Sequence, residues 1–261
     1  MNIIKNSKRL VFKIGTSTLT HETGKLNLKR IELLVRILSD LKNSGKEIIL
    51  VSSGAVSAGC AKLGLDSIPS STEEKQAMAA VGQNEIMKMY GKFFGVYGYT
   101  VSQLLLTKHI LHDEVMRKNA ESTIKKLLAL NCIPIVNEND SVSHEEIKFG
   151  GNDTLSAYVS LVSDADCLIN LSDIDGLYDS DPRTNPDAKL ISTVFKIDDT
   201  IYSYAGGAGS ARGTGGMYTK IKAAEIVCSH GIPMFILNAS NPEIIYDAVE
   251  GRFLGTYFMS Y

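Results

Sequence analysis

The stretch Leu10-Val11-Phe12-Lys13-Ile14-Gly15-Thr16-Ser17 indicates the fold class. Its apolar run, interrupted only by Lys13, predicts a buried β-strand, and the small residues after Ile14 predict the turn that ends it. From Leu28 to Leu41 apolar residues recur at helical spacing, and Gly45 fits just beyond the end of this helix. The stretch therefore predicts the strand, turn and helix that begin an α/β fold.

The same order of strand, loop and helix repeats along the chain. Further strands are predicted at 48–51, 101–105, 133–136 and 167–171, and helices at 55–61, 73–90, 113–130 and 153–162, with a last helix from Met217. In the helix at 73–90 we expect the packed face to carry Ala77, Ala80, Val81 and Met87. Near-continuous apolar strands that alternate with helices predict a mostly parallel sheet covered by helices on both faces.

Composition excludes several classes of protein. The net charge of -2, without a basic tail or patch, does not indicate a nucleic-acid partner. The longest apolar runs fall short of the roughly 20 residues that cross a membrane, and the N-terminus does not resemble a signal peptide. Four cysteines match no metal or redox spacing, and we expect reduced, buried thiols of a cytoplasmic protein: Cys60, Cys132, Cys167 and Cys228.

Small or polar residues follow four of the predicted strands. In a parallel sheet, ligands bind beyond the carboxyl ends of the strands. Any one of these segments alone is an ordinary turn, but together they predict one binding site at that edge. They are Gly15, Thr16 and Ser17; Ser52, Ser53 and Gly54; Asn137, Glu138, Asn139 and Asp140; and Ser172 with Asp173.

Lys13 is unusual because a lysine within an apolar strand is costly unless its ammonium reaches a partner or water. It lies close to the strand end, so its flexible stem can extend to the binding edge and meet an anion. The alternative is a lysine on an edge strand that simply reaches solvent. A central position of the first strand favours the anion site.

A glycine-rich segment, Gly206 to Gly216, precedes the helix that starts at Met217. Bare backbone N–H groups and the positive end of a helix dipole together suit a phosphate. Thr214, Thr219 and Lys220 add side-chain partners of the right type, whereas the alternative is a flexible connector. The sequence contains neither a P-loop nor the G-x-G-x-x-G dinucleotide fingerprint.

Seven segments together resemble the amino acid kinase family, and they cover nearly the whole chain in the expected order. They are residues 11–17, 51–56, 137–140, 152–157, 172–178, 181–186 and 213–220. The resemblance implies a three-layer α/β/α sandwich with a mostly parallel central sheet, built as a single domain over 1–261. It also implies an amino-acid-binding lobe at roughly 1–165 and a nucleotide-binding lobe at roughly 166–261.

Residues 181–186 and 213–220 are similar in particular to the family members that phosphorylate glutamate. The resemblance implies MgATP as donor and the side-chain carboxylate of free L-glutamate as acceptor, giving glutamyl 5-phosphate and ADP, the first step of proline biosynthesis. A carboxylate with a pKa of about 4.3 is already ionised at neutral pH, so the reaction needs no general base. The site must instead offset the repulsion between this anion and the triphosphate.

The resemblance assigns catalysis to Lys13, Asp153 and Lys220. Lys13 and the glycine turn after it would hold the transferring phosphoryl group, and Lys220 would stabilise the developing charge. Asp153 would lie between the two lysines and fix their positions. Its alternative role is to cap the helix that follows, and it could serve as both.

Two further sets of residues are implied for the substrates. The amino-acid set is Ser53, Gly54, Asn137, Asp140 and Asn152. The ATP set is Lys13, Gly15, Ser172, Asp173, Thr214, Gly215, Gly216, Met217, Tyr218, Thr219 and Lys220. The chemistry agrees, because the Asp140 carboxylate suits the substrate ammonium, while Asp173 has the alternative of a structural turn with Ser172. No protein side chains are expected to hold a metal, and Mg²⁺ is expected through the ATP phosphates.

The chain departs from the family pattern at three positions. Gly151 stands where an aspartate commonly precedes the Asn-Asp pair, and Arg212 and Tyr218 are larger than expected. The chain ends at Tyr261 soon after its last strand-like segment, so we expect no C-terminal RNA-modification-type (PUA) domain. The resemblance also implies proline as feedback inhibitor, coupling to glutamyl-5-phosphate reductase, and a homo-oligomer, either a dimer or a tetramer.

Two alternative functions stay open at this point. One is a related kinase that acts on N-acetylglutamate, aspartate, carbamate or a nucleoside monophosphate, because one fold serves many substrates. Asp140 discriminates here, since an acetylated amine has no charge to pair with it. The other is a non-catalytic amino-acid sensor, against which the joint presence of Lys13, Asp153 and Lys220 argues.

Overall fold

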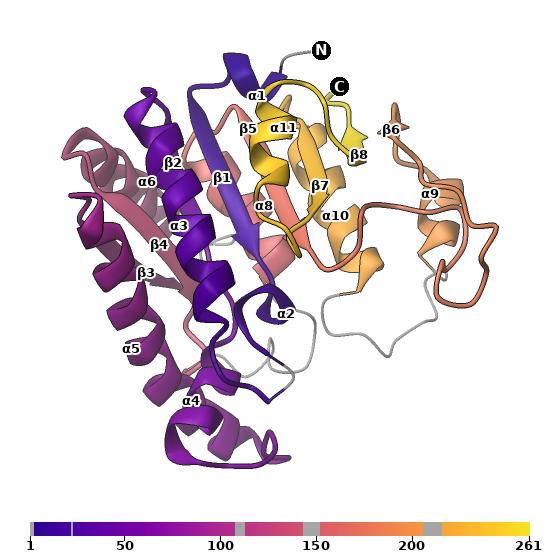
Figure 1. The fold of residues 1–261 in the computed structure, drawn as a ribbon. Helices are drawn as coiled ribbons and strands as arrows, with labels where there is room; N and C mark the ends of the chain where they lie inside the picture. Colours follow the sequence, from indigo (N-terminus) through magenta and orange to yellow (C-terminus); the bar gives the residue numbers. More distant parts are fainter. Residues whose placement is uncertain (1–2, 22, 108–112, 143–151, 206–215) are drawn as a thin grey trace.

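The computed structural model describes residues 3–21, 23–107, 113–142, 152–205 and 216–261. Its strands form one eight-stranded sheet in the order β3-β4-β2-β1-β5-β7-β8-β6 (Figure 1). The strands are β1 (Arg9–Ile14), β2 (Glu47–Val51), β3 (Val101–Leu106), β4 (Ile133–Glu138), β5 (Cys167–Ser172), β6 (Thr193–Val194), β7 (Met234–Asn238) and β8 (Gly255–Phe258). Every pair is parallel except β7 with β8, which confirms the predicted mostly parallel sheet.

The predicted helices are all present, but the one predicted at 73–90 continues to Val96, and four short helices among the described residues were not predicted. The described helices are α1 (Ile3–Asn6), α2 (Thr16–Leu19), α3 (Leu28–Asn43), α4 (Ala55–Leu63), α5 (Thr72–Val96), α6 (Glu114–Ala129), α8 (Asn152–Val162), α9 (Asp199–Tyr204), α10 (Met217–Cys228) and α11 (Ile244–Val249). Asp113 caps α6 by accepting a hydrogen bond from the Met116 N–H, and Ser71 caps α5 in the same way.

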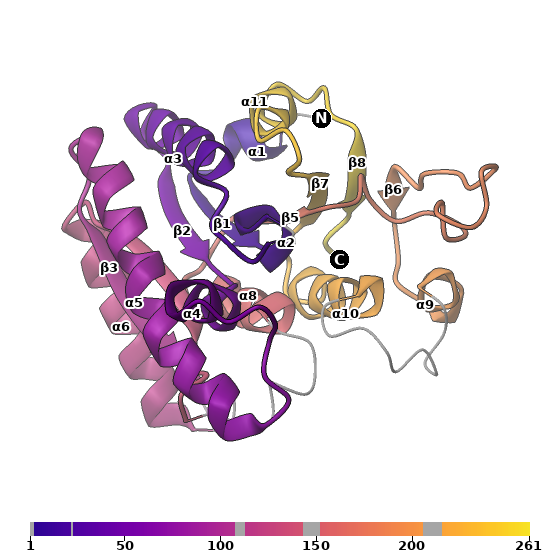
Figure 2. The ribbon, with the colours of Figure 1, turned by 60° about the horizontal axis from the view of Figure 1, so that its bottom comes forward.

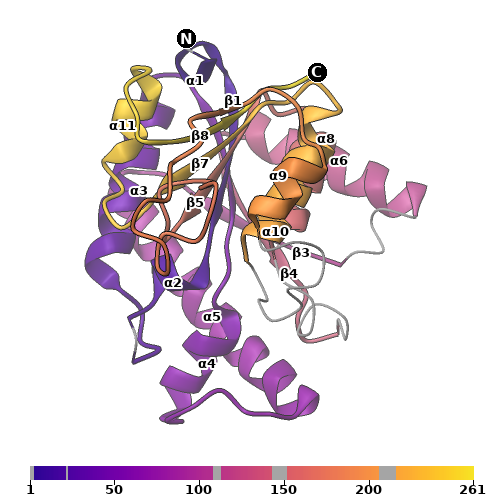
Figure 3. The same cartoon turned by 90° about the vertical axis from the view of Figure 1, so that its right-hand side faces the viewer.

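Two layers of helices cover the sheet, as the alternation of strands and helices predicts. Figure 3 shows α3 and α11 on one side and α6, α8 and α10 on the other. Each layer encloses its own apolar core, and successive residues of a strand alternate between the two. In β1, Phe12 packs into the core under α3, and Val11 packs into the core under α8 and α10.

Strand β1 is central, because it pairs with β2 on one side and with β5 on the other. The edge-strand alternative for Lys13 is therefore wrong. Lys13 shares the face of Val11, which turns its side chain toward α8, and it pairs in register with Asn170 of β5. Two polar side chains thus lie next to each other on the α8 face of an otherwise apolar part of the sheet.

Helices α4 and α5 cross with their backbones in direct contact, which only glycine permits. A Cβ atom on Gly82 would lie 1.8 Å from the Ala55 carbonyl oxygen, and one on Gly59 would lie 1.9 Å from the Met78 carbonyl oxygen. This crossing turns Ala79, Gln83, Ile86 and Tyr90 of α5 inward. Of the predicted face, Ala77 and Ala80 are exposed, whereas Val81 and Met87 are partly buried and Met87 packs against the core.

The cysteine prediction needs one correction. Cys60, Cys167 and Cys228 are buried free thiols, but Cys132 is only partly buried because it lies in the turn between α6 and β4. Burial raises the pKa of Cys167 and raises that of Cys228 to about 12, so these thiols are poor nucleophiles. None of the described helices combines the length and apolar character that crossing a membrane requires.

Candidate active site

The carboxyl ends of the central strands meet at one edge of the sheet, where most of the predicted site residues gather. Figure 2 shows α2, α4, α8 and α10 around this edge. Helices α2 and α4 follow β1 and β2 after short turns, and α8 and α10 bring the segments from later in the chain. Lys13 from β1 and Lys220 from α10 therefore reach the same carboxylate here.

Asp153, in the first turn of α8, is the centre of a charged cluster. Its Oδ1 lies 2.7 Å from the Lys13 Nζ and its Oδ2 lies 3.3 Å from the Lys220 Nζ. Asn170 donates a 2.8 Å hydrogen bond to Oδ1, and Thr219 donates a 2.6 Å hydrogen bond to Oδ2. Each carboxylate oxygen thus accepts from one lysine and one neutral side chain, which holds both lysines on one carboxylate.

The cluster is almost completely removed from water, since Asp153 is 1% exposed and each of the two lysines 6%. Burial alone raises the pKa of Asp153, but the charges of Lys13 and Lys220 and the hydrogen bonds from Lys13 and Thr219 outweigh it and hold the pKa well below its usual range. Burial lowers the pKa of Lys220, while Asp153 opposes that change. Asp153 therefore stays ionised and fully hydrogen-bonded, which is unsuitable for a general base.

Asp153 is not the N-cap of α8, because the helix begins at Asn152 and side chains occupy both of its carboxylate oxygens. The helix-cap alternative for Asp153 is wrong. Gly15 lies beside the cluster: a Cβ atom there would be 3.7 Å from the Lys13 Nζ. The glycine turn after β1 therefore lies within van der Waals distance of this ammonium.

A second, uncharged cluster lies beyond the ends of β2 and β4. The Asn152 Nδ2 lies 2.6 Å from the Ser52 carbonyl oxygen, 2.9 Å from the Ser53 Oγ and 2.8 Å from the Asn137 Oδ1. The Asn137 Nδ2 in turn donates a 2.8 Å hydrogen bond to the Gln83 Oε1. We call Gln83, Asn137 and Asn152 the amide relay, since hydrogen bonds join their three side chains in a row.

Two other predicted amino-acid residues border the amide relay. Gly54 is the N-cap of α4 with φ 91°, a left-handed conformation that favours glycine. Asp140 lies in the turn after β4, three residues after the relay residue Asn137, and is partly buried. The structure thus brings the predicted amino-acid residues to the end of the site formed by β2 and β4.

Six of the predicted ATP residues that the structure describes, Ser172, Asp173, Gly216, Met217, Tyr218 and Thr219, lie at the other end, on or next to β5 and α10. Ser172 donates a 3.3 Å hydrogen bond to Asp173, which agrees with a structural turn. The negative charge of Asp173 also opposes the lowering of the Lys220 pKa by burial. Gly216, Met217 and Tyr218 line a pocket of about 680 Å³ together with residues 176–183 and 203–205. Tyr218 is 38% exposed, and its ring centroid lies 5.3 Å from that of Tyr202.

Several predictions fall outside the described residues. Thr214 and Gly215 do so, as do Gly151, Arg212 and the upstream part of the glycine-rich segment. The larger side chain at Tyr218 does lie in the described part, where it packs against Tyr202 and lines the pocket.

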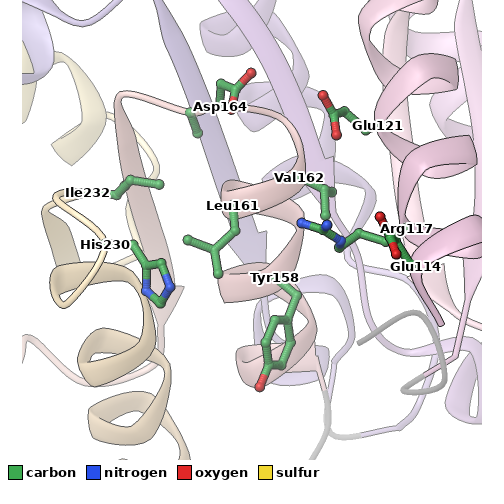
Figure 4. A pocket seen from close by; sticks show the side chains of 10 residues that line it. Glu114, Arg117, Glu121, Tyr158, Leu161, Val162, Asp164, His230 and Ile232 are labelled. Carbon is green, nitrogen blue, oxygen red and sulfur yellow. The ribbon is translucent and has the colours of Figure 1, made fainter. Parts of the chain in front are cut away.

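Another hollow, of about 820 Å³, lies between α6, α8 and the turn after α10 (Figure 4). Its lining includes Arg117, Tyr158, Asp164 and His230, and none of the residues that the sequence predicts for the site. Glu114 and Glu121 add negative charge beside Arg117. This hollow is therefore separate from the charged cluster and the amide relay.

Two residues of the site were missed by the sequence analysis. Asn170 interrupts an apolar strand just as Lys13 does, so the same signal could have identified it. Gln83 is a polar residue on the buried face of α5, between Ala79 and Ile86, but the sequence analysis expected another face of this helix to be packed. Both are buried and hydrogen-bonded to predicted site residues.

Comparison with known proteins shows the family of the chain. Residues 8–238 match the model of the Amino acid kinase family. The chain belongs to the amino acid kinase family. This amino acid kinase is 53% identical over 261 residues to the "Glutamate 5-kinase" of Clostridium perfringens, covering 98% of this chain and 97% of that protein. It is 56% identical over 255 residues to the "Glutamate 5-kinase" of Clostridium tetani, covering 98% and 96%.

Solved structures share the fold of this amino acid kinase at low identity. A UMP kinase from Bacillus anthracis superposes with a TM-score of 0.64 at 18% identity, covering 97% of this chain and 96% of that one. A UMP kinase from Ureaplasma parvum gives 0.67 at 14%, covering 98% and 100%. These likenesses support the three-layer architecture and say nothing of the substrate.

Proposed function

We propose that this chain transfers the terminal phosphoryl group of ATP to the side-chain carboxylate of L-glutamate, forming L-glutamyl 5-phosphate and ADP in the first step of proline biosynthesis. The observation that carries the proposal is the pair of buried lysines held on Asp153 at the ligand-binding edge of the sheet. Near-full-length likeness to glutamate 5-kinases selects glutamate among the substrates that the fold serves. The enzyme is thus a phosphotransferase with a carboxyl group as acceptor.

The reaction needs charge compensation and alignment, and no proton transfer. A carboxylate oxygen of glutamate attacks the terminal phosphorus, and the bond from that phosphorus to the bridging oxygen breaks, so that ADP leaves with the electron pair. Lys13 and Lys220 approach the transferring group from β1 and α10 and offset the charge that develops on it. Asp153 binds no substrate atom in this scheme and keeps the two ammonium groups in place.

The two substrates bind at opposite ends of the ligand-binding edge of the sheet. Ser53, Gly54, Asn137, Asp140 and Asn152 bind glutamate, in the lobe of roughly residues 1–165. Asp140 pairs with the ammonium group, which an N-acetylated substrate lacks. The Asn152 NH₂ group already donates within the relay, so its free oxygen is left to accept a hydrogen bond from the substrate ammonium.

The lobe of roughly residues 166–261 binds ATP. Gly15, Ser172, Asp173 and the segment Thr214 to Lys220 contact the nucleotide. The 680 Å³ pocket beside Tyr218 has the size and aromatic lining for the nucleobase and its ribose. Lys220, one turn into α10, then acts on the phosphates from the charged cluster beside Asp153.

The residues of the site fit Mg²⁺ only as a companion of ATP. Across the described ranges no three His, Cys, Asp or Glu side chains gather as metal ligands, and the four donors on Asp153 already use both of its oxygens. Mg²⁺ commonly keeps its waters and binds through substrate phosphates. When bound, the ion neutralises charge on those phosphates, while the lysines act on the transferring group.

The remaining proposals rest on the family resemblance alone. They are a homo-oligomer, either a dimer or a tetramer, feedback inhibition by proline, coupling to glutamyl-5-phosphate reductase, and a cytoplasmic location. Nucleic acid and membrane are not proposed as partners.

An assay of product trapping tests the proposed function. With ATP, Mg²⁺ and hydroxylamine, we expect a hydroxamate from L-glutamate and none from N-acetylglutamate. Omission of Mg²⁺ or ATP is the control for the phosphoryl donor. Equal rates with the two amino acids would overturn the role of Asp140, and no product from L-glutamate would overturn the proposed function itself.

A further inference from the structure

Backbone groups at the amide relay determine which end of each side-chain amide is the oxygen and which is the NH₂ group. The Asn137 oxygen accepts a 2.9 Å hydrogen bond from the Glu138 N–H, which can only donate, so the other end of this amide is its NH₂ group. That NH₂ group faces Gln83, so the Gln83 atom that receives it must be the carbonyl oxygen. The free end of Gln83 is therefore an NH₂ group, a donor.

The other end of the relay is set in the same way. One amide atom of Asn152 faces the Ser52 carbonyl oxygen, which can only accept, so this atom is the nitrogen. Its oxygen remains as an acceptor. Within the described part of the chain, neither the Gln83 Nε2 nor the Asn152 Oδ1 has a hydrogen-bond partner, and Gln83 is only 8% exposed.

Buried amide groups are rarely left unpaired, because burial removes their hydrogen bonds to water and nothing replaces them. The relay therefore has a free donor at one end and a free acceptor at the other. A free amino acid can form hydrogen bonds with both. Its carboxylates accept hydrogen bonds and its ammonium group donates them. The unpaired atoms are thus complementary to a free amino acid.

The position of Gln83 indicates which group it meets. The relay runs from α5 through Asn137 to Asn152, and Asn152 adjoins Asp153 and the lysines. The reacting carboxylate must lie at that lysine end. Gln83 lies at the opposite end of the relay, and its free donor suits the α-carboxylate, whereas the free oxygen of Asn152 suits the ammonium group. The contact of Gly82 with Ala55 keeps this part of α5 against the start of α4.

We propose that Gln83 is a specificity-determining residue whose side-chain NH₂ donates a hydrogen bond to the α-carboxylate of the bound amino acid. The inference rests on the proposed function. Gln83 and Asp140 then recognise the two charged groups of the α-carbon, and Asn137 links Gln83 to the rest of the site.

Two substitutions separate this role from a structural one. Gln83→Met removes both hydrogen bonds. Gln83→Glu keeps an acceptor for Asn137 but places a negative charge beside the α-carboxylate. If the NH₂ group binds the carboxylate, Gln83→Met raises KM for L-glutamate by about 10- to 100-fold and Gln83→Glu raises it further. In both variants kcat and KM for ATP stay within about threefold of the parent values.

The opposite order would overturn the proposal. If Gln83 only holds Asn137 in place, Gln83→Glu keeps KM near the parent value and Gln83→Met alone raises it. Gln76→Met, on the same helix two turns earlier and partly buried, is the matched control and should leave all constants unchanged. Urea unfolding shows whether each variant is folded, and the isosteric Gln83→Glu is decisive if Gln83→Met fails to fold. Absence of hydroxamate with the parent enzyme would instead contradict the proposed function.

Discussion

The two ends of the site differ in how completely their polar atoms are paired before any ligand binds. In the charged cluster, each oxygen of Asp153 accepts from a lysine and from a neutral donor. In the amide relay, the Gln83 Nε2 and the Asn152 Oδ1 have no partner within the described residues. The charged end is thus organised without substrate, whereas the neutral end is completed by it.

This difference follows from the cost of burying each kind of group. An unpaired buried charge costs far more than an unpaired buried amide, so two lysines beneath the surface require a carboxylate between them. A buried amide that stays unpaired until a ligand binds lowers the stability of the protein only moderately. The comparison indicates that substitutions at the charged end affect both stability and kcat, whereas those at the amide end affect substrate affinity.

The largest effect is expected from Asp153→Asn. This change leaves two buried ammonium groups without their counter-charge, so we expect the free energy of unfolding to fall by about 3–5 kcal/mol and kcat to fall by about 10³-fold or more. Urea unfolding and the hydroxamate assay measure the two effects. A stable, active Asp153→Asn variant would show that the charged cluster is not what holds the lysines.

Lys220→Ala should lower kcat by about 10²- to 10³-fold with a much smaller change in KM for glutamate. Its charge acts mainly in the transition state, because the phosphoryl group gains its extra charge only during transfer. Steady-state kinetics with each substrate varied in turn measure the split. An unchanged kcat would remove Lys220 from the mechanism, and Lys222→Ala, an exposed position on the same helix, is the control.

Asp140→Asn tests the substrate end. Loss of the charge that pairs with the ammonium should raise KM for L-glutamate by about 10- to 100-fold and leave kcat within a few-fold. Discrimination against N-acetylglutamate should shrink by the same factor. If kcat collapses while KM is unchanged, the division between the two ends is wrong.

The smallest effect is expected at the nucleotide pocket. Tyr218→Leu keeps an apolar side chain but removes the aromatic face beside Tyr202, so KM for ATP should rise by about two- to tenfold, since aromatic contacts contribute about 0.5–1.5 kcal/mol. KM for glutamate should not change. An equal rise in both KM values would indicate that Tyr218 supports the whole site and not the nucleotide alone.

Much of the fold was predictable because the spacing of apolar residues, which indicates strands, helices and their buried faces, is a local property of the sequence. The alternation of apolar strands with amphipathic helices determined the parallel sheet and most element bounds, and the repeated helical spacing from Ile31 to Leu41 identified the buried face of α3. The packed face of α5 was not predictable in this way. Its small residues are spread around the helix, and the backbone contact at Gly59 and Gly82 decides which of them turn inward.

The sequence by itself determined which chemical groups the site contains. A lysine in an apolar strand, polar strand ends and a glycine-rich segment before a helix each have a local physical cost that a ligand can offset. Only the tertiary structure decided how these groups pair, because Lys13, Asp153 and Lys220 are far apart in sequence and meet through the order of strands and helices. For the same reason only the structure placed Gln83 and Asn170 in the site, since their role depends on hydrogen bonds across separate elements.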